Sequence, residues 1–276
     1  MATYLKHILT GQLPAEELAM LVGSYDVVGD IAIAIIPEAL LHREQLIGDA
    51  ILQSNIRIKV VLKRSGIYGG EFRTIPLQLI AGEARKETEV KEFGLSYMVN
   101  PESTYFSVRS GSERKRVASL VTEDETVLVL FSGIAPYPLM ISKYGKARKI
   151  IGIEKNPEAH QYGLKNVLRN KKMDNIELCL GDVSEVVPKF TFRFDRVIMP
   201  LPQRAEEFLP LAIMALKKEG TIHYYQMQKA DCFRESVEQV TEALHRENRK
   251  VQSLDVIRCG HCGPKTYRIC VDVTVC

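Results

Sequence analysis

The chain has 276 residues, of which 46% are hydrophobic, enough for one large domain or for a large and a small one. Its formal net charge is only +3, so any surface that binds nucleic acid must be local. No run of 18 apolar residues and no basic leader before an apolar stretch occurs, and we expect neither a membrane span nor a secretory signal. The six cysteines are too sparse for a disulfide scaffold, which favours a cytoplasmic protein with reduced thiols.

The first 98 residues show no repeating alternation of strands and helices, and we predict a small α+β domain over residues 1–98. Gly29-Asp30 marks a turn within DVVGDIAIAII, and Pro37 suits the first turn of a helix. The predicted elements, in chain order, are a helix at 14–23, a strand or hairpin at 26–36, a helix at 37–54, and strands at 56–62, 77–80 and 89–93.

Residues 99–276 follow a different rhythm. A strand-like TYFSV (104–108) and a basic helix, SERKRVASLV, come first, and strands then alternate with helices. The strands are predicted at 126–131, 149–154, 176–181, 196–201 and 220–227, and the helices at about 137–145, 157–170, 203–217 and 231–249. Such alternation predicts a parallel sheet with helices on both faces.

The end of the chain breaks this alternation. Two strands, 251–259 and 267–275, are joined by a short link and therefore form an antiparallel pair. A doubly wound α/β sheet that finishes in an antiparallel hairpin is typical of the class I methyltransferases that use S-adenosylmethionine (SAM), which have a Rossmann-like fold. This analogy predicts a SAM-binding catalytic domain over residues 99–276, after the small N-terminal α+β domain.

Ligands of doubly wound sheets bind at the carboxyl ends of the strands. Gly133 follows the first strand of this sheet, and Glu154 ends the second, where a carboxylate can accept both hydroxyl groups of a ribose. Asp182 and Val183 follow the third strand, where an adenine would lie. Each residue alone is equally compatible with a plain turn or a solvated strand end, but the succession favours a nucleoside site. Without a G-x-G-x-x-G motif, a dinucleotide phosphate cradle is not expected.

The fourth strand ends in Pro200-Leu201-Pro202. A proline pair has no backbone N–H to give and forms a stiff loop whose carbonyl groups can accept hydrogen bonds from a base edge. Methyl transfer needs the acceptor atom close to the donor, so we predict that this loop holds a target base. The alternative is that the prolines only end the strand and start a helix, with Pro202 in its first turn.

These motifs together resemble the archaeal and eukaryotic tRNA (guanine-N1-)-methyltransferase family. The resemblance rests on YFSVRSGSERKRVA, LFSGIAPYPLMISKYG, IGIEKNPEAHQYGLKNVLRN, LGDVSEV and DRVIMPLPQRAEEFL, and in the first domain on SYDVVGDIAIAIIP and GGEFRTIPLQLIAGE. It implies transfer of a methyl group from SAM to N1 of the guanosine at position 37, just 3′ of the anticodon. It begins near Ser24, so the N-terminal tRNA-elbow domain of longer members is expected to be missing.

The resemblance also implies roles for individual residues. Glu113 matches the general base that takes the N1 proton, and Arg73 matches the cation that stabilises charge on guanine O6. Read without the family, Glu113 is a helix partner of Arg116, and Arg73 is a solvated loop charge. The cofactor-binding positions implied are Tyr105, Phe131, Gly133, Glu154, Asp182, Val183 and Pro200, and those for the substrate are Arg109, Arg114, Leu201 and Pro202.

The sequence departs from the family at three places. Val129 stands for an aspartate, Pro200 for an asparagine and Val108 for a proline. Two alternative functions therefore stay open: the aminocarboxypropyl transfer of wyosine biosynthesis, and a non-catalytic relative that binds SAM or RNA. The expected partner is the anticodon stem-loop of tRNA, bound by a monomer through basic segments such as Lys63-Arg64 and Arg114-Lys115-Arg116.

CGHC (259–262) invites a comparison with metal sites. Four-ligand zinc sites generally show a second pair of ligands with matching spacing, which this chain lacks. Cys270 alternates along a strand as a small core residue does. We therefore predict a structural role for this segment and no metal ion.

Overall fold

The computed structural model describes residues 2–201 and 203–276, which divide into two compact units, Met1–Phe106 (unit 1) and Ser107–Cys276 (unit 2). The predicted boundary after residue 98 therefore falls inside unit 1. Residues 99–106 stay with unit 1 because the Phe106 ring packs on Tyr97 (5.6 Å between centroids) and Glu102 accepts a hydrogen bond from Leu77 N (3.0 Å). No helix in the described part of the chain is both long and apolar enough to cross a membrane.

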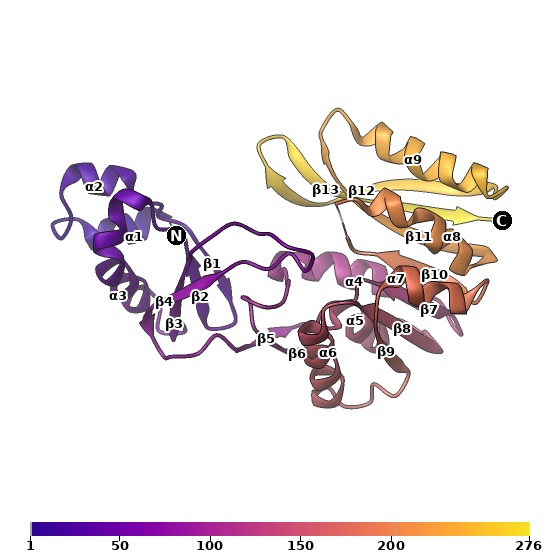
Figure 1. Ribbon diagram of the computed structural model, residues 1–276, viewed down its shortest axis with the longest axis horizontal. Coiled ribbons are helices and arrows are strands. Elements are labelled where there is room, and N and C mark those ends of the chain that lie inside the picture. The colour runs from indigo at the N-terminus through magenta and orange to yellow at the C-terminus, as the bar shows by residue number, and fades with distance from the viewer. Residues whose placement is uncertain (1, 202) are drawn as a thin grey trace. The chain divides into compact units, whose positions relative to one another are not determined.

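Unit 1 is built on a four-stranded sheet with the order β1-β2-β3-β4 (Figure 1). Only β2 and β3 run parallel, and an apolar core that includes Leu9, Ile47 and Val61 joins the sheet to the helices. The elements are α1 (Ala2–Leu9), α2 (Ala15–Met20), β1 (Tyr25–Val28), β2 (Ile31–Ala34), the 3-10 helix η1 (Glu38–Arg43), α3 (Glu44–Ser54), β3 (Val60–Arg64), β4 (Leu77–Gly82), β5 (Thr88–Glu92) and β6 (Leu95–Val99). The last two strands form a separate hairpin.

Of the two alternatives predicted at residues 26–36, a strand or a hairpin, the structure has the hairpin, formed by β1 and β2, which turn at Gly29 with φ +59°. The helix predicted at 37–54 is also present, as η1 and α3. The expected strand at 56–62 begins only at Val60, and the sequence analysis missed α1 and β6 altogether.

Unit 2 contains a seven-stranded sheet with the order β12-β13-β11-β10-β7-β8-β9. Strands β7 to β11 are parallel to one another, and β13 is antiparallel to both of its neighbours. The strands are β7 (Thr126–Leu130), β8 (Lys149–Glu154), β9 (Ile176–Leu180), β10 (Phe194–Met199), β11 (Leu216–Lys229), β12 (Val251–Gly263) and β13 (Thr266–Val275). The predicted doubly wound sheet with an antiparallel end is confirmed.

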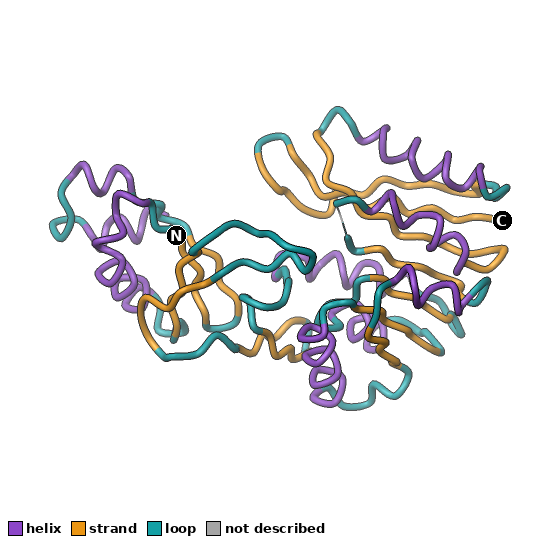
Figure 2. The backbone as a smooth tube through the Cα atoms, viewed as in Figure 1, coloured by secondary structure: helices purple, strands orange, loops and turns teal. Residues whose placement is uncertain are grey.

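Helices separate the parallel strands, and Figure 2 shows this alternation along unit 2. They are α4 (Gly111–Leu120), α5 (Pro136–Tyr144), α6 (Pro157–Arg169), α7 (Val183–Val186), α8 (Leu209–Ala215) and α9 (Phe233–Arg246), with the 3-10 helices η2 (Val108–Ser110), η3 (Val187–Phe190) and η4 (Ala205–Phe208). The strand predicted at 104–108 is wrong. Its backbone bonds locally, Thr104 N to Asn100 O and Ser110 N to Ser107 O, and the chain enters η2 instead.

The two faces of the large sheet differ in character. Side chains alternate between faces along a strand. On one face Leu128, Tyr224 and Val271 join an apolar core with α8 and α9. The neighbouring positions on the other face include Arg196, His223, Tyr225 and Asp272, which are polar although they lie in the middle of the sheet.

Candidate functional site

The loop after β7 has an unusual backbone. Phe131, Gly133 and Ala135 all have positive φ (55°, 56° and 67°), a conformation that costs free energy in residues with a side chain. Hydrogen bonds fix the loop, from Ser132 N to Ile153 O (2.8 Å) and from Ala135 N to Ser132 O (3.0 Å). Such strain gathers at ligand sites. The Phe131 ring itself packs edge-on against Phe208 (4.9 Å), so this residue offers its backbone more than its ring to a ligand.

Glu154 ends β8 and reaches back to this loop. Its Oε2 accepts a hydrogen bond from Gly133 N and its Oε1 from Asn156 N, both at 2.7 Å. No cationic side chain of the described residues pairs with it, and burial raises the pKa of this carboxyl despite those hydrogen bonds. The Lys155 backbone also donates to this carboxylate, and the three backbone hydrogen bonds leave it with one free lone pair. A half-buried carboxylate that pairs with no cation among the described residues fits the hydroxyl groups of a ribose.

Asp182 caps α7 after β9. Its Oδ1 accepts hydrogen bonds from Ser184 N (2.8 Å) and Ser184 Oγ (2.6 Å), and its Oδ2 pairs with Lys155 Nζ (2.7 Å). The hydrogen bonds from Lys155 and Ser184 lower the pKa of Asp182 to about 2. Val183 is buried in the core beside it, so the side chain that can meet an exocyclic amine is that of Asp182.

The fourth strand, β10, ends at Met199, and Leu201 N donates to Met199 O (2.8 Å). Pro200 and Leu201 are both half-buried. Pro202, which the sequence analysis placed with them, lies outside the described residues. The next helix, η4, begins at Ala205 after Arg204, which has φ +57° and pairs with Glu207.

Glu113 lies in the first turn of α4 and is only 6% exposed. Arg116 holds both of its oxygens, with Nη2 donating to Oε1 (2.7 Å) and Nε to Oε2 (2.8 Å). Tyr225 OH, which accepts from Tyr137 OH, also donates to Oε1 (2.6 Å). The helix partnership with Arg116 is therefore real. Oε1 is saturated, and Oε2 retains one lone pair that can accept a proton.

A chain of polar side chains leads from Glu113 across the sheet. Arg116 Nη1 donates to Asp272 Oδ2 (2.6 Å), and Asp272 Oδ1 lies 2.6 Å from His223 Nδ1. Arg196 Nη1 lies 2.7 Å from His223 Nε2, and its Nε and Nη2 donate to Glu125. We call these residues the polar relay: Glu113, Arg116, Asp272, His223, Arg196 and Glu125.

The chemistry of the relay settles the state of His223. A guanidinium can only donate, so Nε2 accepts from Arg196 and Nδ1 carries the hydrogen given to Asp272. Burial lowers the pKa of His223 and keeps the ring neutral. Burial raises the pKa of Asp272, but the hydrogen bonds from His223 and Arg116 outweigh it and hold that pKa well below its usual range.

His223, Cys270 and Asp272 also form a group of metal-ligand type within the described residues. Both nitrogens of His223 are occupied by hydrogen bonds, and the Arg116 guanidinium lies against Asp272. These donors and cations suit a hydrogen-bonded relay rather than a cation.

The basic residues that were predicted to contact RNA differ in their exposure. Arg114 is 2% exposed and donates from both terminal nitrogens to Ser107 O (3.1 Å each), so we no longer count it among the candidate RNA contacts. Arg109, in η2, is exposed. The pair Arg85 and Lys86 is already neutralised by Asp30 and Glu102.

Arg73 and Tyr105 both belong to unit 1. The guanidinium carbon of Arg73 lies 5.2 Å from the centre of the Tyr105 ring, and the Arg73 backbone has φ +53°. Among the described residues, its guanidinium has no hydrogen-bond or ion-pair partner. Arg73 is therefore a cation available to a ligand.

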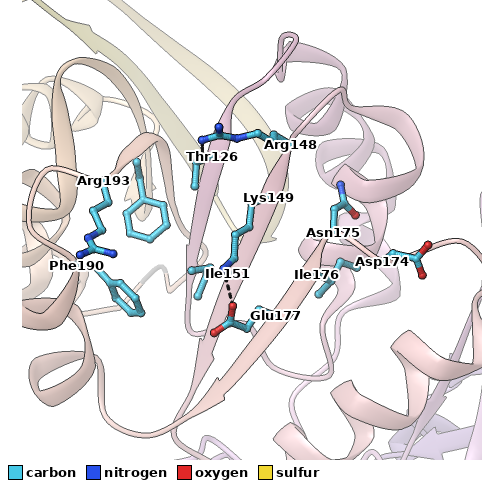
Figure 3. Close-up of a pocket in the computed structure, with 11 residues that line it drawn as sticks. Thr126, Arg148, Lys149, Ile151, Asp174, Asn175, Ile176, Glu177, Phe190 and Arg193 are labelled. Atoms are coloured by element: carbon cyan, nitrogen blue, oxygen red, sulfur yellow. Dashed lines mark hydrogen bonds and ion pairs between the residues drawn. The ribbon is translucent and has the colours of Figure 1, made fainter.

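A separate pocket opens at the opposite edge of the large sheet (Figure 3). Thr126, Lys149, Ile176 and Phe194, which begin β7, β8, β9 and β10, all line it. The side chains of Lys149 and Glu177 point toward each other across it and form an ion pair (2.7 Å). This pocket lies at the amino ends of the strands and contains none of the predicted site residues.

The sequence analysis missed Arg116 as an ion-pair bridge, Tyr225, His223, Asp272 and Arg196. A signal was present, because each of the last four interrupts an otherwise apolar buried strand: HYYQM, ICVDV and FDRVIM. Polar residues at such positions need partners inside the protein.

Comparison with known proteins shows which protein families the chain is similar to. Residues 88–253 match the model of the TRM5/TYW2 methyltransferase domain, and residues 5–85 match the TYW2 N-terminal domain. The second match begins well before Ser24, where the sequence resemblance was first placed.

Two archaeal relatives represent the two kinds of enzyme in this family, a methyltransferase and an aminocarboxypropyltransferase. The chain is 34% identical over 264 residues to a tRNA (guanine(37)-N(1))-methyltransferase, Trm5b, of Pyrococcus abyssi, covering 95% of this chain and 78% of the relative. It is 26% identical over 272 residues to a tRNA(Phe) (4-demethylwyosine(37)-C(7)) aminocarboxypropyltransferase of Pyrococcus horikoshii, covering 98% and 96%.

Solved structures give the same two neighbours. The crystal structure of P. abyssi Trm5b superposes with a TM-score of 0.85 at 33% identity, covering 95% of this chain and 78% of that one. P. horikoshii TYW2 in complex with MeSAdo superposes with a TM-score of 0.82 at 25% identity, covering 100% and 99%.

Proposed function

Because the chain belongs to the TRM5/TYW2 methyltransferase family, we propose that it uses SAM to methylate N1 of guanosine 37 in tRNA. The observation that carries this proposal is the pair of carboxylates in unit 2, the buried Glu113 and the half-buried Glu154. Glu154 pairs with no cation among the described residues and suits ribose hydroxyl groups, and Glu113 is oriented by Arg116 and Tyr225 with one lone pair left.

The residues divide the work as follows. The loop at 131–135, Glu154 and Asp182 hold the cofactor, which supplies an electrophilic methyl group on a sulfonium. Glu113 Oε2 accepts the proton of guanine N1, so that the N1 lone pair is free to form the new N–C bond while the bond from the methyl carbon to sulfur would break and leave its electron pair on a neutral thioether. The proton then leaves Glu113 to solvent.

Unit 1 supplies Arg73, which we propose stabilises the negative charge that develops on guanine O6 as N1 loses its proton. Its guanidinium has no partner among the described residues and lies over the Tyr105 ring. Pro200 and Leu201 are proposed to contact the target base. Arg109 is proposed to contact a phosphate of the anticodon stem-loop.

We further propose that the protein works as a monomer in the cytoplasm. All six cysteines are free thiols, as suits a reducing compartment.

Aminocarboxypropyl transfer is the second candidate, and a specific observation favours it. Residues 5–85 match the TYW2 N-terminal domain, and the chain covers nearly the whole of P. horikoshii TYW2. The greater identity to Trm5b and the Pro200-Leu201-Pro202 sequence favour methyl transfer.

One labelling experiment separates the candidates. Two tRNA substrates are used in parallel: unmodified tRNA, and tRNA that carries 4-demethylwyosine at position 37, the nucleoside in the name of the aminocarboxypropyl transferase relative. Each is incubated with SAM labelled either in the methyl group or in the carboxyl group, and the labelled nucleotide is located by digestion. We expect only methyl label, on N1 of guanosine 37, and none on a control tRNA with adenosine at position 37. Carboxyl label would establish the second candidate. No label with retained SAM binding would leave a non-catalytic relative.

A further inference from the structure

Large apolar side chains are exposed on the segment between β3 and β4. Ile67, Tyr68 and Phe72 are 86%, 50% and 38% exposed, and Tyr105, which comes from a later part of unit 1, is 41% exposed. A single exposed apolar residue needs no explanation, but a group of them with cations marks a binding surface.

The rings and the cations form an ordered row. The guanidinium carbon of Arg64 lies 5.6 Å from the centre of the Tyr68 ring, and that ring meets Tyr105 edge-to-face at 6.3 Å and 72°. Arg73 lies over Tyr105 in turn. We call Arg64, Tyr68, Tyr105 and Arg73 the aromatic row.

The loop that carries Tyr68 is held in shape before any ligand arrives. Ser65 N donates to Pro76 O (3.0 Å), Gly69 N to Thr74 O (3.0 Å) and Arg73 N to Gly70 O (3.3 Å). Arg64 is anchored by Asp26, 2.9 Å from its Nη2. A preorganised loop loses less conformational entropy on binding.

The chemistry of the row selects its ligand. Tyrosine rings flanked by arginines suit an unpaired nucleobase, which stacks on the ring while the guanidinium meets its phosphate or a carbonyl oxygen. A lipid surface would be met by apolar tips and lysines rather than by half-exposed rings braced by arginines. The Arg73 charge, which no described residue neutralises, adds attraction for an anionic chain.

We propose that Tyr68 is a stacking site for an unpaired nucleobase next to the target guanosine. The assignment rests on the proposed function, which gives Arg73 to O6 of the target. Tyr105 is the ring beside Arg73, and Tyr68 is the next ring along the row. It therefore receives a neighbouring base of the anticodon loop and helps to keep the loop open around the target.

The test uses the full-length protein and an anticodon stem-loop RNA with 2-aminopurine directly 5′ or directly 3′ of guanosine 37. Fluorescence reports stacking, and titration gives the affinity. Tyr68→Ala is expected to lose the fluorescence change at one of the two positions and to bind RNA about tenfold more weakly. Tyr68→Trp is expected to retain both. Ile56→Ala is the matched control and should behave as wild type, because Ile56 is also 86% exposed in unit 1 but lies outside the segment between β3 and β4.

The outcomes separate this assignment from the proposed function. If Tyr68→Ala binds and changes fluorescence as wild type, or if Ile56→Ala loses as much as Tyr68→Ala, stacking on Tyr68 is wrong, whether or not N1 methylation occurs. If wild type places no methyl group on guanine N1 while Tyr68→Ala alone loses the fluorescence change, the proposed function falls and the stacking site stands. Melting temperatures of the three variants check that each is folded.

Discussion

Glu154 and Glu113 are two carboxylates of one unit with opposite surroundings. Backbone N–H groups hold Glu154, no cation of the described residues pairs with it, and burial raises its pKa. A guanidinium and a phenol hold Glu113, and a relay of charged partners lies behind it. The carboxylate of Glu154 can therefore accept a further hydrogen-bond donor, which a ribose can give. The second has its direction fixed, as a proton acceptor requires.

Glu113→Gln tests whether Glu113 is the proton acceptor, and it should have the largest effect of the changes considered. An amide cannot take the N1 proton, so the methylation rate constant is expected to fall about 100-fold or more. The affinity for SAM, measured by calorimetry, is expected to change less than about twofold, since hydrogen bonds to Glu154 are untouched. Glu177→Gln, at the opposite edge of the sheet, is the control. Loss of SAM binding together with the rate would make Glu113 structural.

Asp272→Asn tests whether the relay orients Glu113. The change removes a charged partner of Arg116, and we expect the rate constant to fall about tenfold and the free energy of unfolding to drop by about 3 kcal/mol. Urea unfolding and single-turnover kinetics measure the two effects.

A double-mutant cycle distinguishes positioning from mere stability. If Asp272 acts through Glu113, adding Asp272→Asn to Glu113→Gln should cost little further rate. Fully additive rate losses would show that Asp272 does not act through Glu113.

Glu154→Gln tests whether Glu154 binds SAM. One oxygen becomes a donor, so the affinity for SAM is expected to fall about tenfold, with a nearly normal rate constant once SAM is saturating. In wild type, the affinity for SAM should also weaken as the pH falls through a range above 4.5, the ordinary pKa of a glutamate side chain, because the raised pKa lets the accepting carboxylate take up a proton at higher pH. A pH titration of SAM affinity that is flat down to pH 4.5 would contradict this.

Asp182→Ala tests how much the helix cap after β9 contributes to stability, and it should have the smallest effect. Loss of the cap on α7 and of the Lys155 pair is expected to cost about 1 kcal/mol of unfolding free energy at pH 7. Because the folded pKa is lowered to about 2 from 3.8, this contribution is present above pH 3.8 and lost as the pH falls through about 2. A difference that grows on acidification would oppose the prediction.

The sequence predicted the large sheet well because its strands are buried on both faces and read as apolar runs. The strand at 149–154 was predicted to the residue. Strand propensity gave the wrong secondary structure where contacts with other parts of the chain decide it. TYFSV looked like a strand but found no strand partner, and the β6 strand, LSYMV, is fixed by its pairing with β5.

The sequence predicted where the site residues lie along the chain better than it predicted which side chains contact one another. The strand ends pointed to Gly133, Glu154 and Asp182, which the structure places after β7, in β8 and after β9. Arg114 was misjudged because charge alone does not tell which side of a helix faces inward. Together with Glu113 it shares the buried side with Val117 and Ala118. Only the fold could bring Asp272 to Arg116, 156 residues earlier in the chain.

The most direct test of the division between the two carboxylates is one single-turnover experiment with saturating tRNA and increasing SAM. We expect Glu113→Gln to lower the plateau rate constant and to leave the half-saturating SAM concentration unchanged, while Glu154→Gln raises that concentration and leaves the plateau nearly unchanged. If both variants lower the plateau alike, or if Glu113→Gln retains the wild-type plateau, the assignment of base and donor-binding carboxylate is contradicted.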